Sequence, residues 1–320
     1  MAAIAATLAA AASIATASAA VVGTAAASIT TAGTAVASTV APKAGAVGGG
    51  GSSAAKGSAA RQREARTWTV CPASATASDC DFKGDQSIPD AVARANNGDT
   101  IQLRAGRYTP RAYLDVPFRD LVVRAFVVID DKDISLVGER GVVIAGNDKM
   151  PMSAIVVRNA DVNIGHLEIT GFNYEIEEDK IYDGHGIFVI DSKARIDDVT
   201  ISKFQKMGLS GRGDTQLDVS NLRVLDGHVG VWLHETAYLR LRNALVRGND
   251  SSAITAYDSS VAHISGSTVE GNARYGLYAN QQAAVFASNT KVAGNKLGDV
   301  NALAESHIRQ DPPVAAAPAN

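Results

Sequence analysis

The chain has 320 residues, a formal net charge of −3 and 20% charged side chains. Acidic and basic residues are nearly balanced and no concentrated basic patch is present, so the sequence argues against a nucleic-acid partner. Local clusters of charge, rather than this small overall charge, are therefore expected to decide which ligands the chain attracts.

Residues 1–42 carry no charge and are mostly Ala, Ser, Thr, Val and Gly. The stretch from Met1 to Ala19 ends in Ala17-Ser18-Ala19, which is typical of a secretory signal with its cleavage site, although a positive n-region is missing. A low-complexity tail is the alternative. The segment is too weakly apolar to predict a stable membrane span. We therefore expect export to a periplasmic or extracellular location.

The remaining chain divides into three parts by composition. Residues 43–66 contain a glycine run and are typical of a flexible linker. Residues 67–308 are rich in β-branched and apolar residues and are expected to form one folded domain. Residues 309–320, with Pro312-Pro313 and an alanine-rich end, are expected to be a disordered tail.

Two cysteines, Cys71 and Cys80, lie at the start of the folded part and are the only ones in the chain. Behind a possible secretory signal, they indicate a disulfide formed in an oxidising compartment. Two unpaired thiols are the alternative. No further metal ligands lie nearby in the sequence, so we expect no metal site here.

Residues 87–97 show the one clear helical pattern of the chain. Apolar residues recur at helical spacing, Ser87 can cap the start, Pro89 suits the first turn and Gly98 follows the end. An amphipathic helix at this position would cover the open end of a solenoid, whose terminal core would otherwise be exposed.

From Gly184 to Leu303, a small residue followed by an apolar one returns at steps of 22, 22, 23, 23 and 22 residues. The copies are Gly186-Ile187, Gly208-Leu209, Gly230-Val231, Ala253-Ile254 and Gly276-Leu277, and Gly298 opens a weaker sixth. Each copy leads into apolar residues that alternate at period two, with a second β segment later in the unit. Units this small must stack to bury a core. We therefore predict an all-β fold, a single-stranded parallel β-helix with an N-terminal capping helix.

Two motifs carry a family resemblance. Asn249, Asn272 and Asn295 each follow a glycine at a step of 23 residues, and the block Asn97-Gly98-Asp99-Thr100-Ile101 precedes Gly106-Arg107-Tyr108. The asparagine series is similar to the asparagine ladder of right-handed parallel β-helix proteins. The second block resembles the entry to β-helices of the pectin-lyase-like superfamily, where a helix leads into a "GDTI" strand and a "GxY" turn. The resemblance implies the fold and says almost nothing about activity.

Residues 171–183 interrupt the rhythm with roughly ten extra residues. Insertions of this kind collect on one face of a solenoid, and that face often binds ligands. The insert holds four acidic residues that can bind calcium through oxygen ligands, or that are simply solvated: Glu175, Glu177, Glu178 and Asp179. We expect no other cofactor.

Stacked coils place equivalent residues in columns about 4.8 Å apart. If Ile187, Leu209 and Val231 point inward, three outward columns follow. The first is Ile190, Arg212, His234, Tyr257 and Asn280; the second is Phe188, Ser210, Trp232, Thr255 and Tyr278; the third is Lys206, His228, Ser251, Arg274 and Lys296. Together they describe a strip with aromatic platforms and basic residues.

This strip suits an acidic polysaccharide. Arg212 can pair with a carboxylate, Trp232 and Tyr278 can stack on sugar rings, and Lys206, His228, Arg274 and Asn280 can bind substrate. Removal of the proton beside a uronate carboxylate needs a base or acid such as His234 or Tyr257, with Arg212 to neutralise charge. Glu235 and Asp258, one position on, are candidates to orient His234 or to contribute acid–base chemistry. The strip is similar in kind to the sites of polysaccharide lyases and mannuronan epimerases on β-helices.

Three family motifs that would identify the reaction are not found in the sequence, so the reaction type stays open. The "DPHD" motif of the epimerases is missing, and neither the paired aspartates of pectin-degrading hydrolases nor the calcium aspartates of pectate lyases are recognisable. His166, His263 and His307 have no evident partner and are expected to be structural. The sequence thus supports an exported lyase or epimerase of an acidic polysaccharide, with a non-catalytic glycan-binding or envelope structural solenoid as the alternative.

Overall fold

The computed structural model describes residues 63–174 and 180–311. The predicted signal, most of the predicted linker and tail, and the four acidic residues Glu175, Glu177, Glu178 and Asp179 lie outside the described residues. In the part that is described, no helix is both long enough and apolar enough to cross a membrane.

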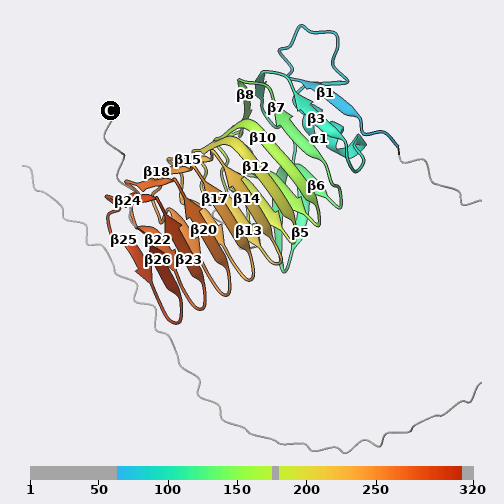
Figure 1. Ribbon diagram of the computed structural model, residues 1–320. Helices are drawn as coiled ribbons and strands as arrows, with labels where there is room; N and C mark the ends of the chain where they lie inside the picture. Colours follow the sequence, from blue (N-terminus) through green and yellow to red (C-terminus); the bar gives the residue numbers. More distant parts are fainter. Residues whose placement is uncertain (1–62, 175–179, 312–320) are drawn as a thin grey trace, which may run out of the picture. The chain divides into compact units, whose positions relative to one another are not determined.

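The described chain winds into coils of short parallel strands that stack on one another (Figure 1). One wall, here called sheet B, has nine strands. In stacking order its strands are β5 (Leu114–Phe118), β6 (Leu121–Asp130), β9 (Ser153–Arg158), β11 (Ile187–Ile190), β13 (Met207–Arg212), β16 (Val229–Leu233), β19 (Ile254–Ala256), β22 (Tyr275–Ala279) and β25 (Gly298–Ala302).

The other strands form one larger sheet, sheet A. Its strands stack in two parallel series, which are called here its first and second columns. The first column is β1 (Thr67–Cys71), β3 (Thr100–Leu103), β7 (Ser135–Gly138), the first halves of β10 (Asp161–Thr170) and β12 (Lys193–Ser202), β14 (Gln216–Ser220), β17 (Tyr238–Arg242), β20 (Val261–Ser265), β23 (Ala284–Ser288) and β26 (His307–Gln310), with β2 (Phe82–Lys83) beside β1. The second column is β4 (Gly106–Tyr108), β8 (Val142–Ala145), the second halves of β10 and β12, β15 (Arg223–Leu225), β18 (Leu245–Arg247), β21 (Thr268–Glu270) and β24 (Lys291–Ala293).

The strand register of sheet B confirms the predicted coils. Ile187 lies opposite Leu209, Leu209 opposite Val231, Val231 opposite Ile254, and Ile254 opposite Leu277. All five side chains are fully buried in one core that runs through the stack. Burying an aliphatic side chain of this size contributes about 1.5–3 kcal/mol, so this column is a main source of stability.

The sixth coil departs from the prediction by one residue. Gly298 lies opposite Tyr275 rather than Gly276, and Val300 takes the place above Leu277. The step to the last coil is therefore 23 residues. Val300 is 42% exposed because no further coil covers it.

Close contact between walls explains why a glycine recurs at the start of the sheet B strands. A Cβ added at Gly230 would lie 2.4 Å from the carbonyl oxygen of Ala253 and 2.6 Å from Cγ1 of Val246. A Cβ added at Gly208 would lie 2.6 Å from Cγ1 of Val224 in the same way. The repeated glycine is thus required by packing against the valines of the second column of sheet A.

The predicted asparagine ladder is present at one turn of the coil. Asn249 Nδ2 donates to Asn272 Oδ1 at 2.9 Å, and Asn272 Nδ2 donates to Asn295 Oδ1 at 2.8 Å. The backbone N–H groups of Asn249 and Asn272 donate to the same oxygens at 3.1 Å. All three side chains are buried, so the ladder satisfies polar groups that water cannot reach.

The N-terminal end is closed by helix α1 (Ser87–Arg94), whose Ile88, Ala91 and Val92 are buried in the core. The predicted cap is wrong: Ser87 is the first helical residue, Gln86 occupies the N-cap, and Ser87 Oγ donates to the carbonyl of Gly84 at 2.6 Å. The helix also ends before the predicted Asn97. The predicted disulfide between Cys71 and Cys80 is present beside it.

Asp99 explains the early end of the helix. Its buried carboxylate accepts hydrogen bonds from the backbone N–H of Asn96 at 3.0 Å and from Trp68 Nε1 at 3.0 Å. Burial alone raises the pKa of Asp99, but hydrogen bonds from the Arg66 and Asn96 backbone, Trp68 and Arg63 bring the pKa well below its usual range. The aspartate of the "GDTI" block therefore ties the helix to the first strand.

An antiparallel hairpin formed by β5 and the start of β6 was not predicted from the sequence. Val116 and Phe118 of this hairpin pack on Phe188 and Ile190, on the outer side of sheet B. Its second strand continues into the parallel wall and pairs with β9. The hairpin tip thus lies beside the face that the sequence marks as a candidate site.

Candidate functional site

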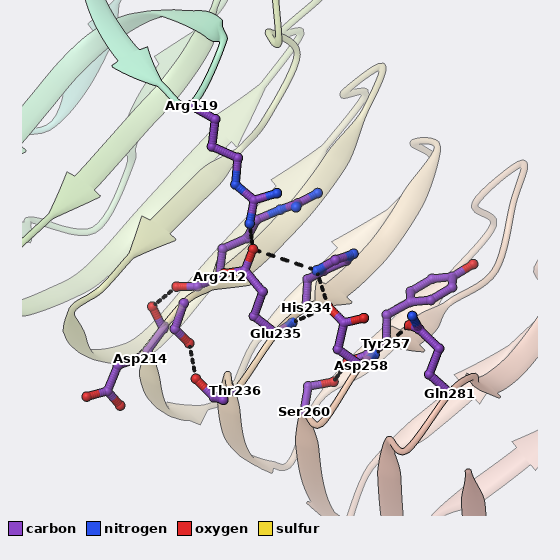
Figure 2. A network of polar contacts seen from close by, with 12 residues as sticks. Arg119, Arg212, Asp214, His234, Glu235, Thr236, Tyr257, Asp258, Ser260 and Gln281 are labelled. Atoms are coloured by element: carbon purple, nitrogen blue, oxygen red, sulfur yellow. Dashed lines mark hydrogen bonds and ion pairs between the residues drawn. The ribbon is translucent and has the colours of Figure 1, made fainter. Parts of the chain in front are cut away.

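The outer face of sheet B carries the candidate residues, here called the strip: Arg212, Trp232, His234, Tyr257, Asp258 and Tyr278. Trp232 lies opposite Thr255, and Thr255 lies opposite Tyr278. Arg212, His234 and Tyr257 come from successive coils, and Figure 2 shows them side by side. The predicted columns are thus brought together, and several contacts that no sequence pattern predicts lie among them.

His234 is paired with the carboxylate of the next coil. His234 Nδ1 lies 2.7 Å from Asp258 Oδ2, whereas Glu235 Oε1 is 3.9 Å away. Glu235 and Asp258 both adopt left-handed backbone conformations, with φ of 63° and 55°, which turn their side chains back toward the strip. Of the two predicted partners, Asp258 is therefore the one that orients His234. With Nδ1 held by Asp258, the neutral ring keeps Nε2 free to accept a proton.

The surroundings of His234 favour the neutral ring. Partial burial lowers its pKa, the Arg212 guanidinium lowers it further, and Asp258 opposes both effects. The His234 side chain is 25% exposed, so a ligand can still reach it. A neutral, accessible imidazole held by a carboxylate has the properties of a general base.

Arg212 is almost completely buried among rings. Its Nη2 donates to the hydroxyl of Tyr182 at 3.0 Å, and its guanidinium carbon lies 5.6 Å from the ring centres of both Tyr182 and Phe118. Tyr182 comes from the end of the insert and Phe118 from the β5–β6 hairpin. Contacts to two such segments fix the guanidinium in place, as carboxylate recognition requires.

Arg119 is a second arginine at this site, and sequence reasoning missed it. It occupies the hairpin tip in a left-handed conformation, with φ of 59°, and forms an ion pair with Glu235. Figure 2 shows Arg119 reaching the strip beside Arg212. The pair joins residues 116 positions apart, and no repeat in the sequence relates them.

Aromatic rings continue the strip toward the C-terminal coils. Trp232 and Tyr257 stack with ring centres 4.9 Å apart, and Tyr257 and Tyr278 lie 5.7 Å apart. With Arg274 and Tyr275 they line a hollow of about 100 Å³. Burial and the contact with Tyr278 raise the pKa of Tyr257 to about 12, so its hydroxyl keeps its proton at neutral pH.

Five covered polar atoms in and beside the strip have no hydrogen-bond partner among the described residues. They are Ser210 Oγ, Arg212 Nε, Trp232 Nε1, His234 Nδ1 and Glu235 Oε1, of which the last two lie in ion pairs. An unsatisfied buried polar group costs about 1–3 kcal/mol, and such groups in folded proteins are few. These atoms are open to hydrogen bonds from a ligand.

The other predicted binding residues divide into two groups. Lys206 lies 3.9 Å from the ring centre of Tyr182, and burial lowers its pKa. Asn280 Nδ2 donates to the hydroxyl of Tyr278 at 3.5 Å. Both therefore border the strip. His228 instead forms an exposed ion pair with Asp250.

Metal ligands do not cluster in the described part of the chain. Across residues 63–174 and 180–311, no group of three or more His, Cys, Asp or Glu side chains is arranged to hold a metal ion. The predicted calcium ligands of the insert fall outside these ranges.

Comparison with known proteins places the coils in a family. Residues 153–309 match the model described as "Right handed beta helix region". The solved pectate lyase Pel9A is similar at 12% identity over 78% of this chain and 78% of that chain, with a TM-score of 0.30. The A-module of the Azotobacter vinelandii mannuronan C-5 epimerase AlgE4 is similar at 16% identity over 70% of this chain and 68% of that chain, with a TM-score of 0.35. No curated protein matches significantly.

The family match covers the same coils whose register, glycine packing and asparagine ladder are described above. These coils are parallel throughout sheet B from β6 onward. The described chain therefore has the right-handed parallel β-helix fold.

Proposed function

We propose that this protein acts on a uronate-containing acidic polysaccharide, as a lyase or an epimerase, at the strip on sheet B. The observation that supports this most is the Asp258–His234 pair beside two arginines. The base must remove the proton on C5 of the uronate, next to the carboxylate. The charge that then develops on the carboxylate needs cations held in place beforehand, and such preorganised charge is a large part of catalysis.

Each residue has a distinct role in this proposal. His234 Nε2 takes the C5 proton while Asp258 stabilises the imidazolium that forms. Arg212, with Arg119 beside it, pairs with the substrate carboxylate. Tyr257, which stays protonated, is the proton donor. Trp232 and Tyr278 provide apolar surface for the neighbouring sugar rings.

The two reactions differ in where the second proton goes. In elimination, the electrons of the broken C5–H bond form a C4–C5 double bond, the C4–O4 bond breaks, and Tyr257 protonates the departing oxygen. In epimerisation, the C4–O4 bond stays intact and a proton returns to C5 from the opposite face. Both reactions begin with the same proton transfer to His234.

A non-catalytic glycan-binding or envelope structural role is the second candidate. The small hollow in the strip, about 100 Å³, favours it, because an enzyme that encloses a sugar ring needs more room. The same residues would then form only a contact surface.

Export is part of the proposal. The Cys71–Cys80 disulfide supports it, because such bonds persist in the periplasm and outside the cell. A periplasmic or extracellular location also gives access to acidic polysaccharides.

The purified protein should be incubated with polygalacturonate, alginate and glycosaminoglycans. Ultraviolet absorbance of unsaturated product detects elimination, and proton NMR detects epimerisation. We expect turnover of at least one uronate polymer and loss of turnover in His234→Ala with an unchanged circular dichroism spectrum. Turnover that survives this substitution would remove the site assignment, and retention on a polysaccharide column without turnover would favour the second candidate.

A further inference from the structure

A larger hollow lies on a different wall, over the first column of sheet A. Its volume is about 600 Å³, against about 100 Å³ for the hollow in the strip. Strands β17, β20, β23 and β26 form its floor, and Figure 1 shows them side by side toward the C-terminal end. Its principal side chains are Tyr238, Arg240, Arg242, His263, Phe286 and Arg309.

Strand register aligns four of these residues in one outward column. Arg240 lies opposite His263, His263 opposite Phe286, and Phe286 opposite Arg309. Three steps between stacked strands span about 14 Å. The hollow is therefore elongated along the stack, and it presents one side chain per coil to a ligand that runs along it.

The lining is basic. Arg240 is exposed and forms no ion pair with any described residue, while Arg309 has Asp311 at 3.2 Å. Arg242 pairs at 2.8 Å with Asp218, which belongs to the neighbouring hollow. Three guanidinium groups thus face a single carboxylate within the lining. The charge excess is local, because the whole chain carries a net charge of −3.

The next hollow along the same face differs in charge. Arg195 and Arg242 line it together with Asp197 and Asp218, so acids and guanidinium groups balance there. The excess of positive charge therefore belongs to the C-terminal hollow and is not a general property of this wall.

The rings of the hollow stack on one another rather than facing outward. His263 and Phe286 have ring centres 4.9 Å apart at an interplanar angle of 19°, and Tyr238 lies 5.6 Å from His263 on the other side. Stacked rings turn their electropositive edges toward a ligand. The stacked His263 and Phe286 cover each other's faces, whereas single-strand binding requires ring faces open to the bases.

We propose that this hollow is a second, non-catalytic site, which binds the carboxylates of an acidic polysaccharide segment lying along the coils. None of its residues belongs to the strip, so the inference goes beyond the proposed function and does not depend on it. Arg240 and Arg309 pair with carboxylates about three coils apart, and Arg242 and His263 contact the segment between them. Such a site would hold a polymer on the protein while the strip acts elsewhere on it.

Calorimetric titration of the full chain with tetragalacturonate tests the proposal. The variant Arg240→Ala/Arg309→Ala should lose one bound oligosaccharide per chain, or at least tenfold in affinity for that site. Arg223→Ala is the matched control, because Arg223 on β15 is exposed and has no ion pair among the described residues. It should bind like wild type. Turnover, if present, should be unchanged in both variants.

The stoichiometry separates this proposal from the first. If the strip also binds, the double variant falls from two oligosaccharides to one, and if it does not, from one to none. Binding by the double variant equal to wild type would overturn the proposal, and so would an equal loss in Arg223→Ala. Arg240-dependent binding of a single-stranded oligonucleotide tighter than that of tetragalacturonate would also overturn it.

Discussion

Two columns of side chains run through the same coils and differ in kind. The asparagine ladder places the same residue in three successive coils, buried and fully hydrogen-bonded. The strip places the buried Arg212 and the partly exposed His234 and Tyr257 in successive coils, with polar atoms of Arg212 and His234 left unsatisfied. The stacking geometry is the same, so repetition of a residue stabilises the fold, whereas variation along a column sets the different side chains of the proposed site beside one another.

The physical reason is the short distance between coils. Identical amides about 4.8 Å apart donate to and accept from each other in a continuous chain, as stacked asparagines do. In the proposed function, different side chains at the same spacing supply an acid, a base and a cation to one sugar residue. Substitutions in the two columns should therefore have opposite effects on stability and on activity.

The largest effect is expected for His234→Gln. Glutamine keeps a polar side chain of similar size but cannot accept the C5 proton, so turnover should fall by about 10²–10⁴-fold. Denaturant unfolding should show a stability close to that of wild type. A turnover loss of less than tenfold would mean that His234 is not the base.

Asn272→Ala tests the asparagine ladder. Removing this amide leaves the backbone N–H and the side-chain Nδ2 of Asn249 without their acceptor, so the free energy of unfolding should fall by about 3 kcal/mol. Urea denaturation followed by circular dichroism measures this change. Asn280→Ala, beside the strip, is the matched control and should cost less than about 1 kcal/mol, since its side-chain hydrogen bond to Tyr278 of the strip is long. An equal loss of unfolding free energy in the two variants would contradict the difference proposed between the asparagine ladder and the strip.

Tyr257→Phe should give a smaller loss of activity than His234→Gln. The substitution removes the hydroxyl but keeps the ring that stacks on Trp232, so turnover should fall by about tenfold or more while stability changes little. Steady-state kinetics at saturating polymer measure the fall. An unchanged rate would exclude Tyr257 as the proton donor.

The smallest effect is a shift in the pH profile. Because His234 must be neutral to act and its pKa lies below the usual value, kcat/KM should fall only when the pH drops below that lowered pKa. Arg119→Ala removes a positive charge, raises the pKa of His234 and should move the acidic limb to higher pH. Asp258→Asn removes a negative charge and should move it to lower pH. Shifts in the same direction for both variants would contradict the assigned electrostatics.

The sequence predicts the regular part of the molecule well, because stacking leaves a periodic signature. A glycine must precede Leu209 and Val231 where the walls touch, and Asn272 must repeat where the turn is buried. The glycine recurs in most of the coils and the asparagine in three of them, so the inward residues and the outward columns follow from spacing. The last coil is the exception, because one additional residue before Val300 shifts Gly298 out of the pattern.

The irregular part of the site leaves no such signature. Arg119 and Tyr182 reach the strip because a hairpin and an insert fold over sheet B, and their positions have no periodic relation to Arg212. Asp258 rather than Glu235 is the partner of His234 because of a contact between neighbouring coils, at 2.7 Å against 3.9 Å, which spacing in the sequence does not give. Each of these features arises from tertiary packing. Spacing in the sequence therefore predicts which residues form the strip, but it does not predict the residues that contact the strip from other segments.

Proton exchange in deuterated water tests the central claim most directly, because elimination and epimerisation share the first step. Polygalacturonate and alginate should each be incubated in deuterated water with wild type and with His234→Gln. We expect wild type to produce either deuterium at C5 of the uronate or unsaturated ends in at least one polymer, and His234→Gln to produce neither above background. Equal deuterium incorporation or equal unsaturated product in the two proteins would contradict the account.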